Sequence, residues 1–203
     1  MHDEGAATKR IELVVALAAL ALPAYAEEAA APAAGEARVD ELTAEYTMRY
    51  QFEGPAKAIP VAEQALAAAE AAFGPGHERV AQVLNDLGHL WQQPPGDLER
   101  AARLHARALE IRERVFGGDG VEVVQSLNNL AKVYVAQARY AKAQAVSERA
   151  IAIAERHVSP TDPFLIGVLG PYADALRGGG EPEAAEAVEA RIKAIRAVER
   201  PEA

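Results

Sequence analysis

Residues 98–158 read LERAARLHARALEIRERVFGGDGVEVVQSLNNLAKVYVAQARYAKAQAVSERAIAIAERHV. Apolar residues recur there every three or four positions, and two short polar or glycine-rich breaks interrupt the pattern, at Gly117–Gly120 and at Ala138–Arg139. Such periodicity is typical of amphipathic helices. It predicts three consecutive helices, over Leu98–Phe116, Val121–Gln137 and Tyr140–His157.

The pattern repeats itself at a fixed interval. At a shift of 42 residues Ala101 falls on Ala143 and Ile111 falls on Ile153, and at a shift of 43 residues Phe73 falls on Phe116. Self-similarity at a period of this size is the sequence signature of stacked repeats. Five further helices are expected upstream and downstream of these three: Val39–Phe52, Ala56–Phe73, Glu78–Gln92, Phe164–Arg177 and Pro182–Glu199. The sequence therefore predicts eight helices and no strand.

The helix pairs resemble tetratricopeptide repeats, whose signature places L-G-x-x-Y in the first helix and A-x-x-x-F in the second. The first unit has Leu87-Gly88-x-x-Trp91 and then Ala101-x-x-x-His105. The second and third units follow the same spacing, with these residues: Leu130-Ala131-x-x-Tyr134, Ala143-x-x-x-Ser147, Tyr172-Ala173-x-x-Leu176 and Ala185-x-x-x-Glu189. The small residues are expected to let the two helices of a pair cross closely.

The period of 42 and the run Ser126-Leu127-Asn128-Asn129-Leu130-Ala131 are similar to the kinesin-light-chain subclass. The resemblance covers Ala56 to Ala197 and implies an all-α, right-handed α-solenoid of antiparallel helix pairs, with about three repeats plus flanking helices. The sequence departs from the family at Ala138, where the family turns on glycine. Because a left-handed conformation costs alanine about 1 kcal/mol, we expect the turn at Ala138 to have a different shape.

The resemblance also implies which side chains face the concave groove of the solenoid. The expected groove residues are Gln82, Asn85 and His89 in one unit and Gln125, Asn128 and Lys132 in the next. Amide side chains each offer a donor and an acceptor, so they can bind an extended peptide backbone. The open alternative is that duplication copied the asparagines and that water satisfies them. Lys132 alone supplies too little positive charge for a site that captures C-terminal carboxylates.

Nothing in the sequence predicts an enzyme, a cofactor or a metal site. The chain has no cysteine, and its five histidines include no HExxH pair. Its formal net charge of −9 argues against a nucleic-acid partner. The arginines of residues 98–116 are expected to pair with acidic residues one helical turn away, as in Glu99–Arg103 and Glu110–Arg114.

The N-terminus predicts export. Lys9-Arg10 precedes the apolar run Ile11–Leu22, and Ala24-Tyr25-Ala26 has the small–x–small pattern of a signal-peptidase site. We therefore expect residues 1–26 to be a signal peptide, 27–37 an Ala/Pro/Glu-rich linker and 38–200 the repeat domain, which would be periplasmic or secreted and without stable membrane insertion after cleavage. The expected function is an exported protein–protein interaction module that binds a protein or peptide segment in the groove. The alternative is a structural spacer or self-associating subunit of the cell envelope, and the sequence leaves the oligomeric state open.

Overall fold

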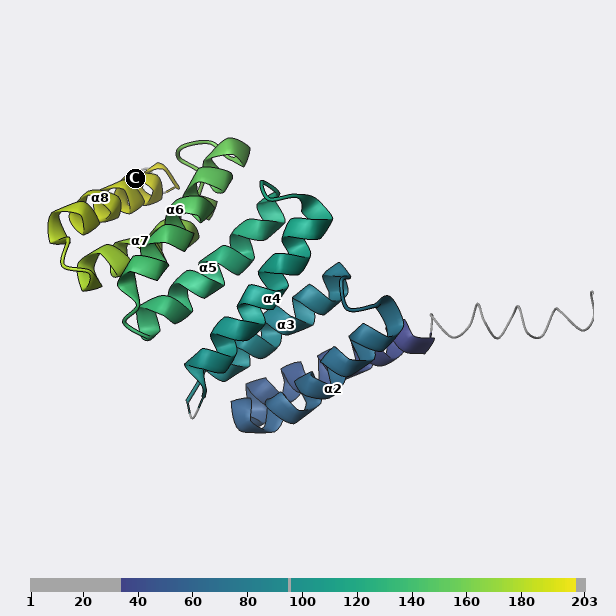
Figure 1. The fold of residues 1–203 in the computed structure, drawn as a ribbon. Helices are drawn as coiled ribbons and strands as arrows, with labels where there is room; N and C mark the ends of the chain where they lie inside the picture. The colour runs from purple at the N-terminus through teal and green to yellow at the C-terminus, as the bar shows by residue number, and fades with distance from the viewer. Residues whose placement is uncertain (1–33, 95, 200–203) are drawn as a thin grey trace, which may run out of the picture.

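The computed structural model describes residues 34–94 and 96–199, and within these it contains eight helices and no strand. The first helix covers residues 34–53. The others are α2 (Pro55–Phe73), α3 (Glu78–Gln92), α4 (Leu98–Phe116), α5 (Val121–Ala136), α6 (Tyr140–His157), α7 (Phe164–Gly178) and α8 (Pro182–Glu199). Successive helices stack side by side from the N-terminal helix to α8 (Figure 1). The all-α solenoid predicted from the sequence is therefore confirmed.

The expected helix bounds hold to within one residue for α2 to α8. Asp97 caps α4 by accepting a hydrogen bond from the backbone N–H of Arg100 at 2.9 Å, as N-cap aspartates do. Residues 34–37, which the sequence assigned to the linker, are already helical. The predicted signal peptide and the rest of the predicted linker lie outside the described residues.

Small side chains at the helix crossings allow each pair to pack closely. Ala101, Ala131 and Ala143 are fully buried. Gly88 lies directly against the ring of His105, so that a Cβ atom at Gly88 would stand only 2.7 Å from the ring atoms. Glycine is thus required at this position by a close approach between α3 and α4.

The buried apolar residues form three clusters along the stack. One joins the N-terminal helix to α2, α3 and α4, and a second joins α5 to α6, α7 and α8. A smaller third cluster of Ala101, Ala102, Leu130 and Val133 connects α4 to α5, with Trp91 and Tyr134 packed against it. Trp91 and Tyr134 therefore contribute to packing, as expected from the sequence.

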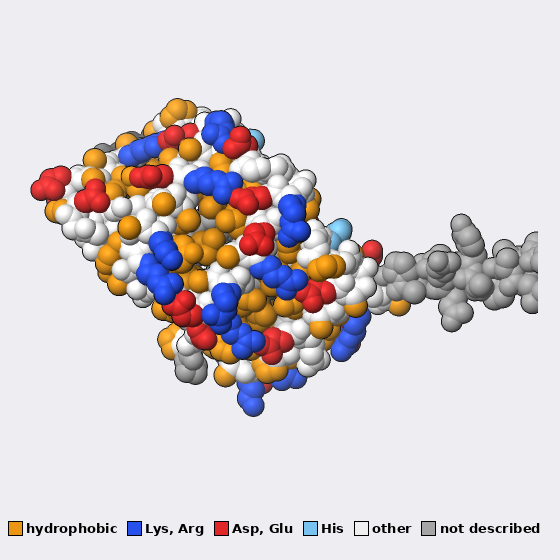
Figure 2. Space-filling view, viewed as in Figure 1, with side chains coloured by type: hydrophobic (Ala, Val, Ile, Leu, Met, Phe, Trp, Pro, Cys, Tyr) orange, Lys and Arg blue, Asp and Glu red, His pale blue; other side chains and the backbone are white. Residues whose placement is uncertain are grey.

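Successive second helices are linked by ion pairs across the outer face. In each pair the arginine lies in the later helix and its carboxylate partner in the preceding unit: Glu63–Arg100, Glu70–Arg107, Glu113–Arg149, Asp119–Arg156 and Glu155–Arg191. Basic and acidic side chains accordingly alternate over the face shown in Figure 2. The first helices pack directly instead, since α3 contacts α5 and α5 contacts α7.

These pairs correct the expectation of ion pairs within α4. Glu99 binds Arg139 at 2.7 Å rather than Arg103, and the guanidinium of Arg114 donates to the backbone carbonyl of Glu110. The carboxylates face the neighbouring helix because the stack brings that helix within reach, which sequence spacing within one helix does not reveal. Exposed pairs of this kind each contribute at most about 1 kcal/mol.

The turn at Ala138 is also different from the expectation. Ala138 adopts the left-handed conformation with φ of 55°, and it is the only non-glycine residue with positive φ among the described residues. The backbone N–H groups of Ala138 and Arg139 donate to the carbonyls of Val135 and Tyr134 at 2.9 and 2.8 Å. These hydrogen bonds close the turn between α5 and α6 in the glycine-type geometry even without glycine.

Candidate functional site

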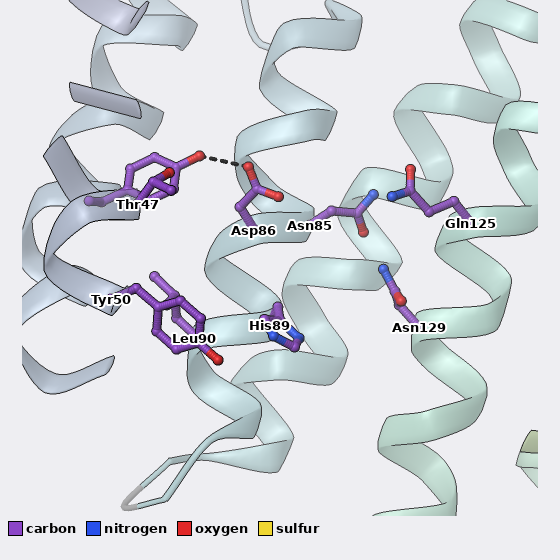
Figure 3. A pocket seen from close by; sticks show the side chains of 9 residues that line it. Thr47, Tyr50, Asn85, Asp86, His89, Leu90, Gln125 and Asn129 are labelled. Atoms are coloured by element: carbon purple, nitrogen blue, oxygen red, sulfur yellow. Dashed lines mark hydrogen bonds between the residues drawn. The ribbon is translucent and has the colours of Figure 1, made fainter. Parts of the chain in front are cut away.

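A pocket of about 340 Å³ opens between the N-terminal helix, α3 and α5. These are first helices of successive pairs, so the pocket lies on the face of the stack opposite the outer ion pairs. We call it the inner pocket, and it is lined by Tyr46, Thr47, Tyr50, Asn85, Asp86, His89, Leu90, Gln125 and Asn129. In Figure 3 the side chains of Gln125 and Asn129 point from α5 toward α3.

Three of the six groove residues predicted from the sequence line this pocket: Asn85, His89 and Gln125. Gln82 and Lys132 are exposed on the same two helices, and Asn128 is half-buried on α5. Their placement on α3 and α5 agrees with the expected face, and a role in peptide binding stays a prediction for all six.

The phenol of Tyr46 binds the carboxylate of Asp86 at the back of the pocket. Its hydroxyl donates to Asp86 Oδ2 at 2.6 Å, the bond dashed in Figure 3. From the other side, Gln82 Nε2 approaches Oδ1 at 3.4 Å. Burial raises the pKa of Asp86 above its usual value, and hydrogen bonds from Tyr46 and Gln82 oppose the rise. Burial together with the charge of Asp86 raises the pKa of Tyr46, so its hydroxyl remains a donor at neutral pH.

At the mouth of the pocket Tyr50 and His89 meet edge to face. Their ring centroids are 6.0 Å apart and their planes are inclined by 78°. Both side chains are exposed, whereas Tyr46 and Leu90 behind them are buried. The pocket therefore has an aromatic rim and a polar interior.

Asn85 is less accessible than the sequence suggested. Only 2% of its surface is exposed, and its amide is already engaged on both sides. Its Oδ1 binds His105 Nδ1 at 2.8 Å, and its Nδ2 donates to Ser126 Oγ at 3.2 Å. Asn85 thus forms part of the pocket wall by holding α3 to α4 and α5.

His105 continues this buried network as a neutral imidazole. Its ring is fully buried. Its Nε2 lies 2.7 Å from Gln92 Nε2, and its Nδ1 is hydrogen-bonded to Asn85 Oδ1. Burial lowers the pKa of His105 to about 4, with further contributions from His89, Lys132 and Arg112. A single tautomer with the proton on Nδ1 satisfies both contacts, because Nε2 then accepts from the amide of Gln92.

Arg112 completes the network from α4, and sequence reasoning missed it. Its side chain is only 2% exposed, yet it pairs with Glu78 at 3.0 Å. It also donates to Gln125 Oε1 at 2.8 Å and to Ser126 Oγ at 3.1 Å. A buried guanidinium with several acceptors is well satisfied. Arg112 therefore holds Gln125 in the pocket wall.

The pocket residues that the sequence did not identify are Tyr46, Thr47, Tyr50, Asp86, Leu90 and Asn129. Asp86 and Asn129 directly follow the predicted Asn85 and Asn128 on α3 and α5. Acidic and amide side chains recurring one repeat apart were the available signal. No sequence signal indicated that the N-terminal helix lines the pocket, because that helix does not match the repeat.

No group of three or more His, Asp or Glu residues in the described parts of the chain is arranged to hold a metal ion. Within residues 34–94 and 96–199, no helix is long and apolar enough to span a membrane. What the inner pocket offers is one carboxylate, several amides and two exposed aromatic rings, which are groups suited to binding.

Comparisons with known proteins agree with this fold. The family model described as tetratricopeptide repeat matches residues 95–156. The crystal structure of BtubC (BKLC) from P. vanneervenii is similar with a TM-score of 0.73 and 26% identity, over 81% of this chain and 65% of that one. The present chain thus spans a little less than two-thirds of that protein.

Two structures of a Podosopora anserina protein, described as a kinesin light chain with nearly identical TPR-like repeats, share the fold. One gives a TM-score of 0.71 at 16% identity and the other 0.66 at 19% identity. They cover 81% and 79% of this chain, and 77% of their own chains in each case. No curated protein sequence matches the chain. Residues 95–156 are thus similar to tetratricopeptide repeats, and the described part of the chain has the fold of a tetratricopeptide-repeat solenoid, a repeat type that generally serves as a scaffold for protein–protein interaction.

Proposed function

We propose that this protein binds a peptide segment of a partner protein in the inner pocket and along the neighbouring surfaces of α3 and α5. The observation that carries the proposal is the pocket itself, which brings the carboxylate of Asp86 and the amides of Gln125 and Asn129 to one opening. An extended peptide presents donors and acceptors at regular intervals, and exposed amides can match both. The protein would then act by binding, without catalysis.

The rigidity of the pocket wall supports this proposal. Asn85, His105 and Arg112 are buried. Asn85 binds His105, and both Asn85 and Arg112 donate to Ser126, so that hydrogen bonds connect α3, α4 and α5. A preformed surface loses little conformational freedom when a partner binds, which favours affinity. By contrast the side-chain amide of Asn129 makes no hydrogen bond with another described residue, so it is available to a ligand.

A selection of random peptides displayed on phage, carried out against residues 27–203, tests the proposal. Asn129→Arg places a long charged side chain at the opening of the pocket and should abolish binding of the selected peptides. The matched control is Ala145→Arg, which adds the same charge at an exposed position of α6, away from the inner pocket. Equal loss in both variants, or no loss in Asn129→Arg, would contradict binding in the pocket; circular dichroism melting would show that both variants fold.

We further propose that the protein acts outside the cytoplasm. The support is the basic pair Lys9-Arg10, the apolar run Ile11–Leu22 and the sequence Ala24-Tyr25-Ala26. N-terminal sequencing of protein purified from the cells that produce it should find Glu27 as the first residue. Recovery of an intact N-terminus from the cytoplasmic fraction would contradict export.

Exposed apolar residues on the N-terminal helix favour a second candidate, self-association as a spacer. Met48 and Phe52 are 57% and 71% exposed. Contact with another copy of the chain would bury this apolar area. Light scattering at micromolar concentration distinguishes the candidates, since the binding module is expected to be monomeric. A polymer that dissociates in the Phe52→Ser variant would favour the spacer.

A further inference from the structure

The carboxylate of Asp86 has no cationic partner. No Lys, Arg or His among the described residues lies within ion-pair distance of it, and its two hydrogen-bond donors, Tyr46 and Gln82, are neutral. Burial is the main reason why its pKa is raised, and the charges of His89 and Arg112, which act from beyond ion-pair distance, oppose the rise without cancelling it. The inner pocket thus contains a carboxylate that has no direct ion-pair partner among the described residues.

The nearby arginines are already committed to other carboxylates. Arg79 pairs with Asp40, and Arg112 pairs with Glu78 at 3.0 Å. Neither can turn toward Asp86 without breaking its own pair, and for the buried Arg112 that would be costly. His89 lines the same pocket but lies beyond ion-pair distance of Asp86, so a bound cation would be the first to contact this carboxylate directly.

The remaining groups of the pocket suit a cationic head. A carboxylate can accept about four hydrogen bonds, and Tyr46 and Gln82 use only two of these positions. Asn129 adds a free amide oxygen, and the exposed ring of Tyr50 at the mouth offers a face of the kind that attracts cations. Figure 3 shows Tyr50, Asp86 and Asn129 around one opening. The volume of about 340 Å³ is at the small end for ligand sites, which fits one long side chain.

We propose that the inner pocket receives a lysine or arginine side chain of the bound peptide, and that its cationic head pairs with Asp86. This proposal rests on the proposed function, because it takes the ligand to be a peptide. It defines the partner as a segment with at least one basic residue in a fixed position. An acidic residue at this position of the peptide would be repelled by the carboxylate of Asp86.

The test is a position-scanning library of free peptides built on a sequence from the phage selection. Against the wild-type protein, Lys or Arg should be preferred at one position over Gln and Glu. Asp86→Asn keeps the size and the contact with Tyr46 but removes the charge, and should weaken the basic peptide by about tenfold or more. Asp86→Lys should reverse the preference at that position toward Asp or Glu.

Two controls complete the experiment. Asp174→Asn removes an exposed carboxylate from α7, outside the pocket, and should leave affinity unchanged. The capped single residue N-acetyl-lysine methylamide separates a peptide side chain from a free amine such as ethylamine, which lacks the backbone. Displacement of the peptide by ethylamine as readily as by the capped lysine would mean that the pocket binds amines in general.

The outcomes separate this inference from the proposed function. Peptides that need an open pocket but show no preference for Lys or Arg would overturn the inference and leave peptide binding standing. Basic peptides whose affinity is unaffected by Asp86→Asn would also overturn it. Failure of any peptide to bind would contradict the proposed function itself.

Discussion

Two successive junctions of the solenoid share a helix arrangement and differ in their buried centre. Where α3 and α4 meet α5, the centre is polar and contains Asn85, His105 and Arg112. One repeat later, where α5 and α6 meet α7, the positions of His105 and Arg112 are occupied by Ser147 and Ala154. The same backbone geometry is thus filled in two ways.

The difference shows how one side chain determines whether neighbouring buried polar groups find hydrogen-bond partners. In the first junction Asn85 and His105 bind each other, at 2.8 Å. In the second junction Asn128 Oδ1 and Ser147 Oγ are buried and have no hydrogen-bond partner within the described part of the chain. Serine is too short to replace the imidazole. The polar junction is the one that adjoins the inner pocket, so its hydrogen bonds serve to fix the pocket wall.

The largest effect is expected from Arg112→Met, which converts the first junction toward the second. Removal of the guanidinium leaves Glu78 and Gln125 without this donor, and Ser126 with only the amide of Asn85. Because Glu78 keeps 30% of its side chain exposed, we expect a loss near the lower end for a broken buried pair, about 3 kcal/mol in the free energy of unfolding by urea. Arg149→Met, which breaks an exposed pair, should cost less than about 1 kcal/mol. Similar costs for the two would contradict the distinction between buried and surface pairs.

A second effect concerns pH and should be confined to the polar junction. The pKa of His105 is lowered from 6.5 to about 4 in the folded protein. Between these values the unfolded chain binds a proton that the folded chain does not, so stability is complete above about pH 6.5 and falls toward pH 4. The fall attributable to His105 should reach about 2–3 kcal/mol.

The measurement is urea unfolding from pH 7 to pH 4 in the wild type and in His105→Phe. The phenylalanine variant keeps an aromatic ring but cannot titrate, so its curve contains the contributions of all other groups, including the opposite one from Asp86. Between pH 7 and pH 4 the wild type should lose about 2–3 kcal/mol more stability than the variant. Parallel curves would show that His105 is protonated as easily in the folded protein as in the unfolded chain.

Gly88→Ala tests the close contact between α3 and α4. Its Cβ would stand 2.7 Å from the ring of His105, so overpacking should cost about 1–3 kcal/mol. In a His105→Ser background, which reproduces the second junction, the same change should instead stabilise by up to about 1 kcal/mol, because alanine favours helix. Gly167→Ala in α7, where nothing lies within 4 Å, is the matched control and should stabilise in both backgrounds. An unchanged sign for Gly88→Ala would refute the proposed contact.

The smallest effect is expected at the turn that joins α5 to α6. Ala138→Gly removes the strain of a left-handed alanine, about 1–2 kcal/mol, but raises the entropy of the unfolded chain. The net gain should be about 0.5–1 kcal/mol, seen as a small rise in Tm. Ala136→Gly, at the helical end of α5, should lower Tm instead. A lower Tm for Ala138→Gly would show that the alanine is unstrained.

The repeat period and the small residues at helix crossings were sufficient to predict the fold. Spacing of Ala101 and Ala143, with apolar residues between them, determines helix length and pairing directly. The site was harder to predict because a shift of one residue on a helix rotates a side chain by about 100°, which separates the buried Asn85 from the half-buried Asp86. Arg112 could not be assigned to the interior, since only the combined arrangement of Glu78, Gln125 and Ser126 makes its burial favourable.

Hydrogen exchange measured by mass spectrometry, with and without a selected peptide, tests most directly that the polar junction forms the binding site. The account predicts slower exchange over residues 43–53, 82–90 and 122–130, which surround the inner pocket, and little change in α6, α7 and α8. Protection centred on α6 and α8, with residues 82–90 unchanged, would contradict it.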